Sequence, residues 1–478
     1  MSRTLIKNAC ILTMDPRLGD LPQGDVLIVD DCIADVAPRI DAAADQTIDG
    51  TGTIVLSGLI NAHIQTWETA LRGIGADWAG TDYFSFFHAK LAPLYTPQDS
   101  FIGTLVGSLA QLDAGVTTIF DWCHNNATPA HSDAAIDALF TSGIRAVFGH
   151  GTVKRPPKPG QPHFSQVPHP VGEIQRLRKG RLSDDQALVT LAMAILGPDY
   201  STLEVCRQDF RAAREFDLLS SAHVWGRANR LVPGGYRTIA AEGLLGPDHN
   251  LAHGNYIEDD ELRILVDSGA TVTSTAGGEI NNHVRPPLTG RISRMGGKPS
   301  IGVDSEAAHK GDMFEVMRLA LQVQRLFANM ETVRRIEAER ESDAAKFAQS
   351  NLKTIGTGGS LIDAVSFKVR EPLEWATLNN AKALRLDHRI GSLTPGKQAD
   401  LIMVRRDALH MVSAQDPVQA VVAYAQSTDV DTVMVAGRIV KRDGKLSFGG
   451  LPGRLDELRA SAARLLAEAQ ARAQPAAA

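Results

Sequence analysis

Histidine and aspartate side chains recur where short apolar runs of this sequence end. His63 and Gln65 follow the run GLINA, and His223, His253 and Asp304 end later runs. Imidazole nitrogens and carboxylate oxygens are the ligands that bind zinc or iron in hydrolytic sites. A metal held in this way lowers the pKa of a water ligand toward neutrality, and a carboxylate then accepts its proton. The joint order of the three histidines and the aspartate predicts a metal-dependent hydrolytic site.

The apolar runs that carry these residues alternate with longer helical patterns. This alternation extends from about residue 58 to residue 390 and is typical of βα units with a parallel sheet. Eight such strands predict a TIM-type barrel, in which the chemistry lies at the carboxyl ends of the strands. We expect the strands at residues 57–63, 116–122, 144–150, 188–196, 218–224, 250–254, 271–276 and 300–305.

The two ends of the chain have a different character from its middle. Short strand-like segments separated by Gly, Asp and Pro occupy residues 1–57, and similar segments return after residue 390. We therefore predict an α/β fold in which a (β/α)8 barrel spans residues 58–389. A small β-sandwich domain is expected from residues 1–57 and 390–452 together. A C-terminal helix and tail are expected over residues 453–478, and barrel helices over 100–115 and 312–342.

The composition is ordinary for a soluble globular protein. Of the 478 residues, 44% are hydrophobic and 22% are charged, and the net charge of -6 is spread over both signs. This distribution argues against a nucleic-acid-binding protein, which carries a basic stripe. The four cysteines form no CxxC pair, which favours a reducing compartment. Because we find neither a signal peptide nor an apolar run of about 18 to 20 residues, we expect a cytoplasmic protein without a membrane contact.

Several motifs resemble those of the amidohydrolase superfamily, in particular its heteroaromatic deaminases and chlorohydrolases. GLINAH followed by TALRG is similar to the first-strand motif of the family, LAHG to its sixth-strand histidine segment, and IGVDS to its eighth-strand aspartate. The segment LEWATLNNAKALRLDHRIGSLTPGKQADLIMV, residues 373–404, is close to the C-terminal signature of the family. The resemblance covers nearly the whole chain, and the fold prediction rests mainly on this long segment.

The resemblance implies a mononuclear metal hydrolase. His63, His223 and Asp304 would bind one divalent metal ion, zinc or alternatively iron. His253 would polarise the substrate, and Asp304 would also accept the proton of the metal-bound water. The fourth strand ends without a lysine, so the bridging ligand of binuclear members has no candidate. The implied reaction cleaves a C–N (amine or amide) or C–halogen bond in a small cyclic, aromatic or heteroaromatic substrate, and the implied assembly is a homo-oligomer.

Two positions depart from the pattern of the family. Gln65 stands where the family has a second histidine, and an amide oxygen is a weaker zinc ligand than an imidazole nitrogen. Gln65 either ligates the metal, alters the site, or is a laboratory substitution that traps substrate. Gly226 stands where the deaminases place a glutamate that carries protons to the ring. Glu279 and Glu306 are the candidate replacements. These departures leave open a lyase, isomerase or decarboxylase on the same scaffold, or a non-catalytic binding protein.

Aromatic residues near the strand ends are candidates for substrate contacts. Trp67, Trp122 and Trp225 lie at or just after the ends of the first, second and fifth strands. Aromatic walls with a few polar groups suit a flat cyclic substrate. The alternative is that these large side chains pack the mouth of the barrel against its helices.

Two loops are also candidates for the binding of a substrate. The polar loop after the seventh strand carries Glu279, His283 and Arg285, and the guanidinium of Arg285 suits a substrate carboxylate. A surface ion pair is the alternative for Arg285. The proline-rich segment 154–170 is expected to form either a lid over the site or a contact with another subunit.

Overall fold

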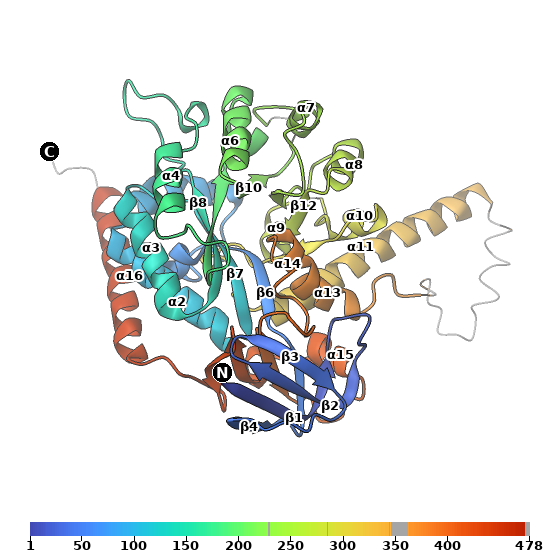
Figure 1. The fold of residues 1–478 in the computed structure, drawn as a ribbon. Helices are drawn as coiled ribbons and strands as arrows, with labels where there is room; N and C mark the ends of the chain where they lie inside the picture. The colour runs from blue at the N-terminus through green and yellow to red at the C-terminus, as the bar shows by residue number, and fades with distance from the viewer. Residues whose placement is uncertain (228–229, 284, 344, 346–361, 363, 474–478) are drawn as a thin grey trace.

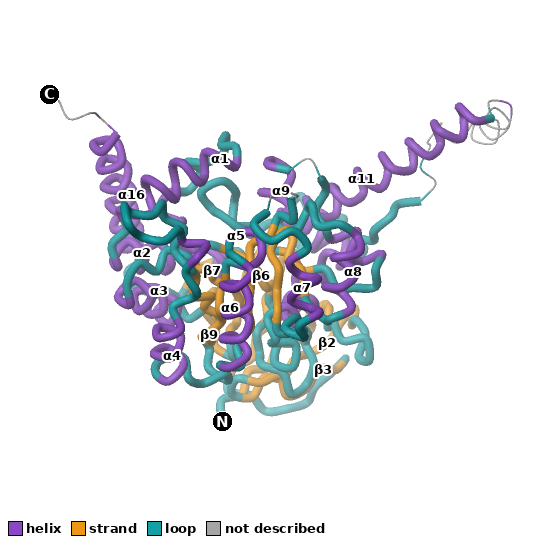
Figure 2. Tube along the Cα trace, turned by 90° about the horizontal axis from the view of Figure 1, so that it is seen from above, coloured by secondary structure: helices purple, strands orange, loops and turns teal. Residues whose placement is uncertain are grey.

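An eight-stranded parallel sheet forms the centre of the protein. The computed structural model describes residues 1–227, 230–283, 285–343, 345, 362 and 364–473. The sheet has the order β13-β12-β11-β10-β9-β8-β7-β6, and helices surround it (Figures 1 and 2). Its strands are β6 (Leu59–Ile64), β7 (Val116–Cys123), β8 (Arg145–Gly151), β9 (Val189–Ile195), β10 (Leu219–Val224), β11 (His249–His253), β12 (Thr271–Ser274) and β13 (Ser300–Ile301).

The two outer strands of this sheet meet beside the predicted site. A parallel bridge joins Ile64 to Asp304, and the backbone N–H groups of Val303 and Asp304 donate to the carbonyl of His63. Gly302 permits this approach, because a Cβ there would lie 2.7 Å from the backbone nitrogen of His63. The barrel is thus nearly closed, which confirms the predicted fold. The eighth strand is shorter than expected because the chain turns toward β6 after Ile301.

Amphipathic helices cover the outside of the barrel. The capping box of Thr96 and Asp99, with Pro97 in the first turn, starts α2. The helix α11 projects away from the barrel (Figure 2). The main helices are α2 (Pro97–Asp113), α3 (Pro129–Ser142), α4 (Val171–Lys179), α6 (Leu203–Glu215), α7 (Gly235–Ala241), α8 (Asp259–Asp267), α10 (Thr289–Arg294), α11 (Met313–Ser342) and α16 (Leu451–Ala473).

Short helical segments fill the connections. They are α1 (Gly80–Asp82), α5 (Gly197–Tyr200), α9 (Ala276–Asn282), α13 (Arg370–Glu374), α14 (Asn380–Ala383) and α15 (Pro417–Gln419), with the 3-10 or π turns η1 (Thr66–Leu71), η2 (Tyr83–Leu91), η3 (Ala92–Leu94), η4 (Phe164–Gln166), η5 (Trp375–Asn379), η6 (Ala420–Tyr424) and η7 (Ser427–Asp429). The segments η1, α1 and η2 follow β6 in this order, at the carboxyl end of the barrel where the predicted site is expected.

Both ends of the chain build a second, mixed sheet, as predicted. Its order is β17-β16-β15-β14-β5-β1-β2-β3, and β4 pairs with β1. The strand β5 joins the two halves, because it runs parallel to β1 and antiparallel to β14. The strands are β1 (Arg3–Leu12), β2 (Leu21–Val29), β3 (Cys32–Ala37), β4 (Gln46–Asp49), β5 (Thr53–Ser57), β14 (Leu401–Arg405), β15 (Val430–Val435), β16 (Arg438–Arg442) and β17 (Lys445–Leu446).

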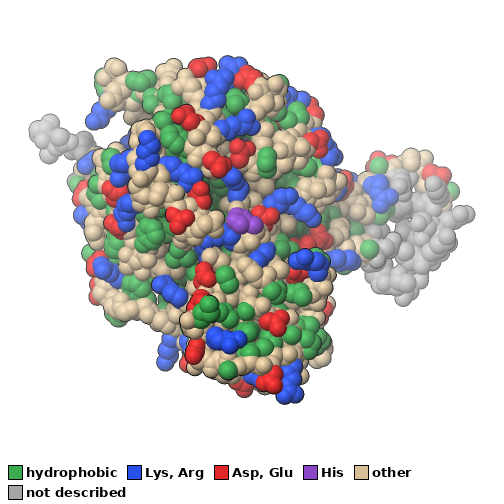
Figure 3. All heavy atoms as spheres, in the orientation of Figure 1, with side chains coloured by type: hydrophobic (Ala, Val, Ile, Leu, Met, Phe, Trp, Pro, Cys, Tyr) green, Lys and Arg blue, Asp and Glu red, His purple; other side chains and the backbone are tan. Residues whose placement is uncertain are grey.

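Charged side chains of both signs lie on the surface of the protein. Figure 3 shows basic and acidic side chains intermixed over the visible face. No helix within the described ranges is both long and apolar enough to cross a membrane. All four cysteines are free thiols.

Candidate active site

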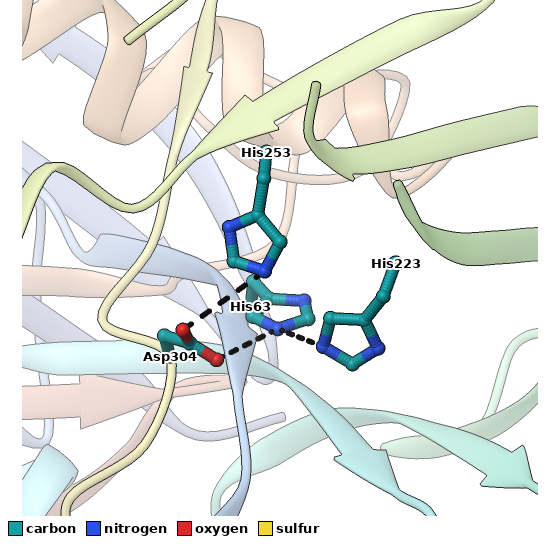
Figure 4. Close-up of side chains that lie close together, drawn as sticks. All are labelled: His63, His223, His253 and Asp304. Atoms are coloured by element: carbon teal, nitrogen blue, oxygen red, sulfur yellow. Dashed lines mark hydrogen bonds and ion pairs between the residues drawn. The ribbon is translucent and has the colours of Figure 1, made fainter. Parts of the chain in front are cut away.

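Three histidines and one aspartate meet at the carboxyl ends of the barrel strands (Figure 4). His63 lies near the end of β6, His223 in β10, His253 at the end of β11, and Asp304 after β13. The Nε2 atom of His63 lies 3.1 Å from Nε2 of His223 and 3.3 Å from Oδ1 of Asp304. Nε2 of His253 lies 4.0 Å from Oδ2 of Asp304. The structure thus brings together all four residues that the sequence singled out.

Two of these residues have an unusual backbone conformation. The φ angle is 75° at His253 and 78° at Asp304. Left-handed backbone at a residue other than glycine costs about 1 to 3 kcal/mol, and such residues concentrate at functional sites. The surrounding strands hold both residues in place, since His253 pairs with Val224 and Asp304 with Ile64. The fold therefore sustains this strain in order to turn both side chains into the cluster.

The donor set of the cluster fits a divalent metal ion. The ligand atoms of the four residues lie within 4.8 Å of one another. A tetrahedral zinc ion with N and O ligands at about 2.0 to 2.2 Å separates those ligands by about 3.3 to 3.6 Å. The distances of 3.1 and 3.3 Å from Nε2 of His63 to its two neighbours are close to this spacing. The Nε2 atoms of His63 and His223 and the carboxylate of Asp304 therefore converge as the ligands of one ion would.

The protonation states also suit metal binding. Burial lowers the pKa of His63 and lowers that of His223 well below its usual value, so both imidazoles are neutral and offer lone pairs. Burial alone would raise the pKa of Asp304. The hydrogen bond with His63 and the proximity of the His253 and His63 imidazoles reverse this effect and hold the pKa of Asp304 at about 2. The cluster thus combines neutral nitrogens with an ionised carboxylate.

A cavity of about 780 Å³ opens directly from the cluster, within the roughly 300 to 1,000 Å³ range of small-molecule sites. Trp225 forms part of its wall and stacks on His253, with ring centroids 4.2 Å apart and 10° between the planes. The indole of Trp225 donates to the hydroxyl of Tyr200 at 2.7 Å. Trp78 and Phe84 add further aromatic surface. This lining suits a flat ring beside the cluster.

The comparisons with known proteins agree with this geometry. Residues 54–348 and 342–440 match the model of the Amidohydrolase family. The chain belongs to the amidohydrolase family. A 5'-deoxyadenosine deaminase of Methanosarcina mazei is 25% identical over 475 residues, which cover 98% of this chain and 99% of that protein. The protein is therefore an enzyme, a hydrolase of this family.

Two solved structures show the same fold. An adenosine deaminase from Xanthomonas campestris with bound zinc has a TM-score of 0.79 at 18% identity and covers 98% of this chain and 99% of its own. The atrazine chlorohydrolase TrzN from Arthrobacter aurescens TC1, complexed with zinc, has a TM-score of 0.78 at 19% identity and covers 96% and 100%. The amidohydrolase thus shares its architecture with deaminases and a chlorohydrolase.

Gln65 faces the cluster but offers it a donor. Its Nε2 donates to Oδ1 of Asp304 at 2.8 Å and lies 3.3 Å from Nε2 of His223. Its Oε1 points away and accepts from the hydroxyl of Tyr83 at 2.8 Å. In this orientation Gln65 has no lone pair directed at the cluster, so the geometry does not support the predicted ligand role. The amide instead orients the carboxylate of Asp304.

The predicted replacements for the missing glutamate do not line the cavity. Glu279 is fully buried and accepts from the backbone N–H of Thr275 at 2.7 Å, and its Oε1 lies 3.4 Å from Nδ1 of His253. It therefore orients His253 from behind. The carboxylate of Glu306 binds Arg72 at 3.1 Å and the hydroxyl of Thr69 at 2.5 Å. Neither glutamate reaches the space in front of the cluster.

Position 226 itself excludes a side chain. Gly226 has a φ of 77°, and a Cβ there would lie 2.6 Å from the backbone nitrogen of Ile257 and 2.5 Å from its Cγ1. A glutamate at this position would need the loop after β10 to take another path. The backbone conformation of this loop thus requires glycine where the deaminases have a glutamate.

The other predicted substrate contacts divide into two groups. Trp225 and His283 line the cavity, and their ring centroids lie 4.1 Å apart. Trp67 and Trp122 are 0% and 1% exposed and do not line the cavity. Their side chains therefore serve packing, the alternative to substrate contact. Arg285 is exposed on the surface, where it pairs with Glu258 at 3.0 Å. Arg285 therefore forms a surface ion pair, the alternative to binding a substrate carboxylate.

A buried acid behind Gln65 was not found from the sequence. Glu68 is fully buried, and its Oε1 lies 2.6 Å from the hydroxyl of Tyr83, while its Oε2 accepts from Ser305. Burial raises the pKa of Glu68 to about 8, although the hydrogen bonds of Ser305 and Tyr83 lower it. Glu68 is therefore protonated at neutral pH. Tyr83 lines the cavity and so connects this acid to it.

Glu68→Gln is expected to reduce the fall in the free energy of unfolding that the parent shows as the pH rises from 4.5 to about 8. The pKa of Glu68 is about 8 in the folded protein and 4.5 as the ordinary value, so the folded state keeps a proton that the unfolded state releases. The free energy of unfolding therefore falls between pH 4.5 and about 8. Relative to the parent, the variant should gain up to about 4 kcal/mol over this range. Denaturant titrations at pH 5 and pH 8.5 measure this gain.

The exposed Glu215→Gln on α6 is the matched control and should follow the parent at both pH values. If Glu68→Gln and Glu215→Gln show the same dependence on pH, the assignment of a buried, protonated Glu68 is wrong.

Proposed function

We propose that this amidohydrolase binds one divalent metal ion, zinc or alternatively iron, and hydrolyses a C–N or C–halogen bond of a small heteroaromatic molecule. The observation that carries the proposal is the cluster of His63, His223, His253 and Asp304, which opens into an aromatic cavity. His63, His223 and Asp304 would hold the ion. When bound, the ion supplies a Lewis acid that makes water a nucleophile at neutral pH.

The residues of the chain have separate roles in this proposal. Asp304, ionised because its pKa is about 2, accepts the proton of the attacking water. Gln65 holds its carboxylate in place by donating to Oδ1. His253, fixed by Glu279 on one side and Trp225 on the other, donates to the charge that develops on the substrate. The stack of Trp225 on His253 also provides a surface for the ring.

The relatives support the class of substrate. A protein named 5'-deoxyadenosine deaminase acts at a C–N bond of a purine ring, and an atrazine chlorohydrolase acts at a C–halogen bond of a triazine ring. Both substrates are flat nitrogen heterocycles of a size that suits a cavity of about 780 Å³. Some deaminases protonate the ring with a glutamate at the position of Gly226. Because a side chain is excluded there, the amidohydrolase must use a different residue to protonate the ring or the leaving group.

Two measurements on one preparation test the proposal. Metal analysis of protein purified without chelator, beside Gln65→His, should find near one ion per chain in the parent and tighter binding in the variant. Metal in the variant alone would restrict the proposal to a protein with histidine at position 65. Turnover of a panel of amino- and chloro-heterocycles in ¹⁸O-labelled water should place one labelled oxygen in the product. Product without label would instead support the lyase, isomerase or decarboxylase alternative.

The cellular setting belongs to the same proposal. Free thiols at all four cysteines support a cytoplasmic location. The exposed Leu326 and Met330 on the projecting helix α11 support a homo-oligomer, since they offer apolar surface to a second copy. Light scattering of the purified protein measures the assembly.

A further inference from the structure

Lys154 places a buried positive charge in the wall of the cavity. Its side chain is 7% exposed, and it lines the same cavity as His223 and Asp304. Its ammonium lies 4.3 Å from the ring centroid of Tyr200 and 5.6 Å from that of Trp122. Within the described part of the chain, no side-chain or backbone oxygen forms a hydrogen bond or ion pair with it. The contacts that the structure gives this ammonium are with aromatic faces.

Such an ammonium is costly without an anion. Burial lowers the pKa of Lys154 to about 8, while the charges of Asp304 and Asp199 raise it. The amine therefore remains mostly charged at neutral pH. The two aromatic faces offset only part of its lost hydration, because a cation–π contact is weaker than the desolvation penalty of a buried ion. The free cavity consequently contains a positive charge that a ligand can neutralise.

The other cations of the cavity are already satisfied or exposed. Arg230 forms an ion pair with Glu261 and lies 4.0 Å from Asp199. Arg227 is exposed, and its guanidinium lies 5.3 Å from the ring centroid of Tyr256. Lys154 therefore differs from both in being buried, charged and unpaired. One such ammonium balances one negative charge.

We propose that Lys154 binds a carboxylate of the substrate, so that the amidohydrolase prefers heteroaromatic acids to neutral heterocycles. The inference rests on the proposed function for the presence of a ring in this cavity. A carboxylate fits better than a phosphate because Asp199 and Asp304 line the same cavity and would repel a second negative charge. The role that the sequence suggested for Arg285 thus passes to a lysine inside the cavity.

A pair of ligands that differ only in charge tests this assignment. Nicotinate and 3-nitropyridine carry planar, isosteric CO₂⁻ and NO₂ groups on the same ring. Calorimetric titration of the metal-loaded protein should find nicotinate bound roughly 10-fold or more tightly, the effect of a charge-assisted hydrogen bond. Lys154→Met should bring the two affinities to near equality. Lys158→Met, an exposed lysine of the same loop, should preserve the preference.

Other results would overturn the proposal. If Lys154→Met keeps the full preference, the metal or the histidines hold the carboxylate. If no matched pair of acid and nitro compound, across one-ring and fused-ring heterocycles, shows a preference in the parent, the cavity does not select an anion. Lys154→Arg keeps the positive charge and should keep a preference for the carboxylate, even if Lys154→Met fails to fold. Loss of this preference in Lys154→Arg would also count against the proposal. Because binding is measured without turnover, failure of the hydrolysis assay leaves this result unaffected.

Discussion

Asp304→Asn is expected to lower kcat by about 10²- to 10⁴-fold, the usual contribution of a general base. The carboxylate has a pKa of about 2 and is therefore ionised at every working pH, whereas an amide cannot accept a proton. The variant also loses a charged oxygen 3.3 Å from Nε2 of His63, which would hold the proposed metal ion, so bound metal should decrease. Turnover of whichever heterocycle the screen identifies, together with metal analysis of the same sample, measures both effects.

Asp209→Asn is the matched control for this experiment. Asp209 is also a buried carboxyl, 1% exposed on α6, but it accepts from the backbone of His169 and does not line the cavity. Its replacement should leave kcat near that of the parent. An Asp304→Asn variant that retains more than a tenth of the parent kcat would show that another group accepts the proton.

Gly226→Ala and Gly226→Glu should both destabilise the protein by more than about 3 kcal/mol. The left-handed backbone costs a residue with a Cβ about 1 to 2 kcal/mol, and the contact of 2.6 Å with the backbone of Ile257 adds the cost of displacing a strand-end loop. Restoring the glutamate of the deaminase pattern should therefore impair folding without creating a ring deaminase. Denaturant titration gives the stability, and ammonia release from purine nucleosides gives the activity.

Gly243→Ala separates the two causes. Gly243 also has a positive φ, 68°, but a Cβ there would meet no atom within 4 Å. It should lose about 1 to 2 kcal/mol, the conformational cost alone. If Gly226→Ala is no more destabilised than Gly243→Ala, the loop after β10 can move, and a side chain at position 226 is tolerated.

The sequence predicted the strands and the cluster because both obey simple rules. Parallel strands are buried on both faces, so each is an apolar run, and a polar residue at the end of a run marks the carboxyl end of the strand. His63, His223 and Asp304 are found in this way. The length of the last strand was less predictable, since the turn at Asp304 depends on its φ and on the contact of Gly302 with His63.

The lining of the cavity was predicted less well, because the type of a residue does not reveal whether its side chain points into the cavity or into the interior. Trp67 and Trp225 both follow strand ends, yet Trp67 packs against Phe87 in the interior and Trp225 stacks on His253 in the cavity. Lys154 lies in a proline-rich loop, whose burial no periodic pattern reports. Glu68 offered one signal, a carboxylate in the otherwise uncharged segment HIQTWETAL. Its raised pKa depends on Tyr83 and Ser305, which only the folded chain brings to it.

The pairing of β5 with β14 has a consequence for biosynthesis. Ser57 lies opposite Leu401, so a strand made early on the ribosome waits for a partner more than 340 residues later. Until then β5 keeps an unpaired edge, which other nascent chains can join. Contacts so distant in sequence also form slowly. A chain shortened before residue 401 would contain every member of the cluster but should aggregate during expression, whereas co-expression of the missing C-terminal segment should rescue its solubility.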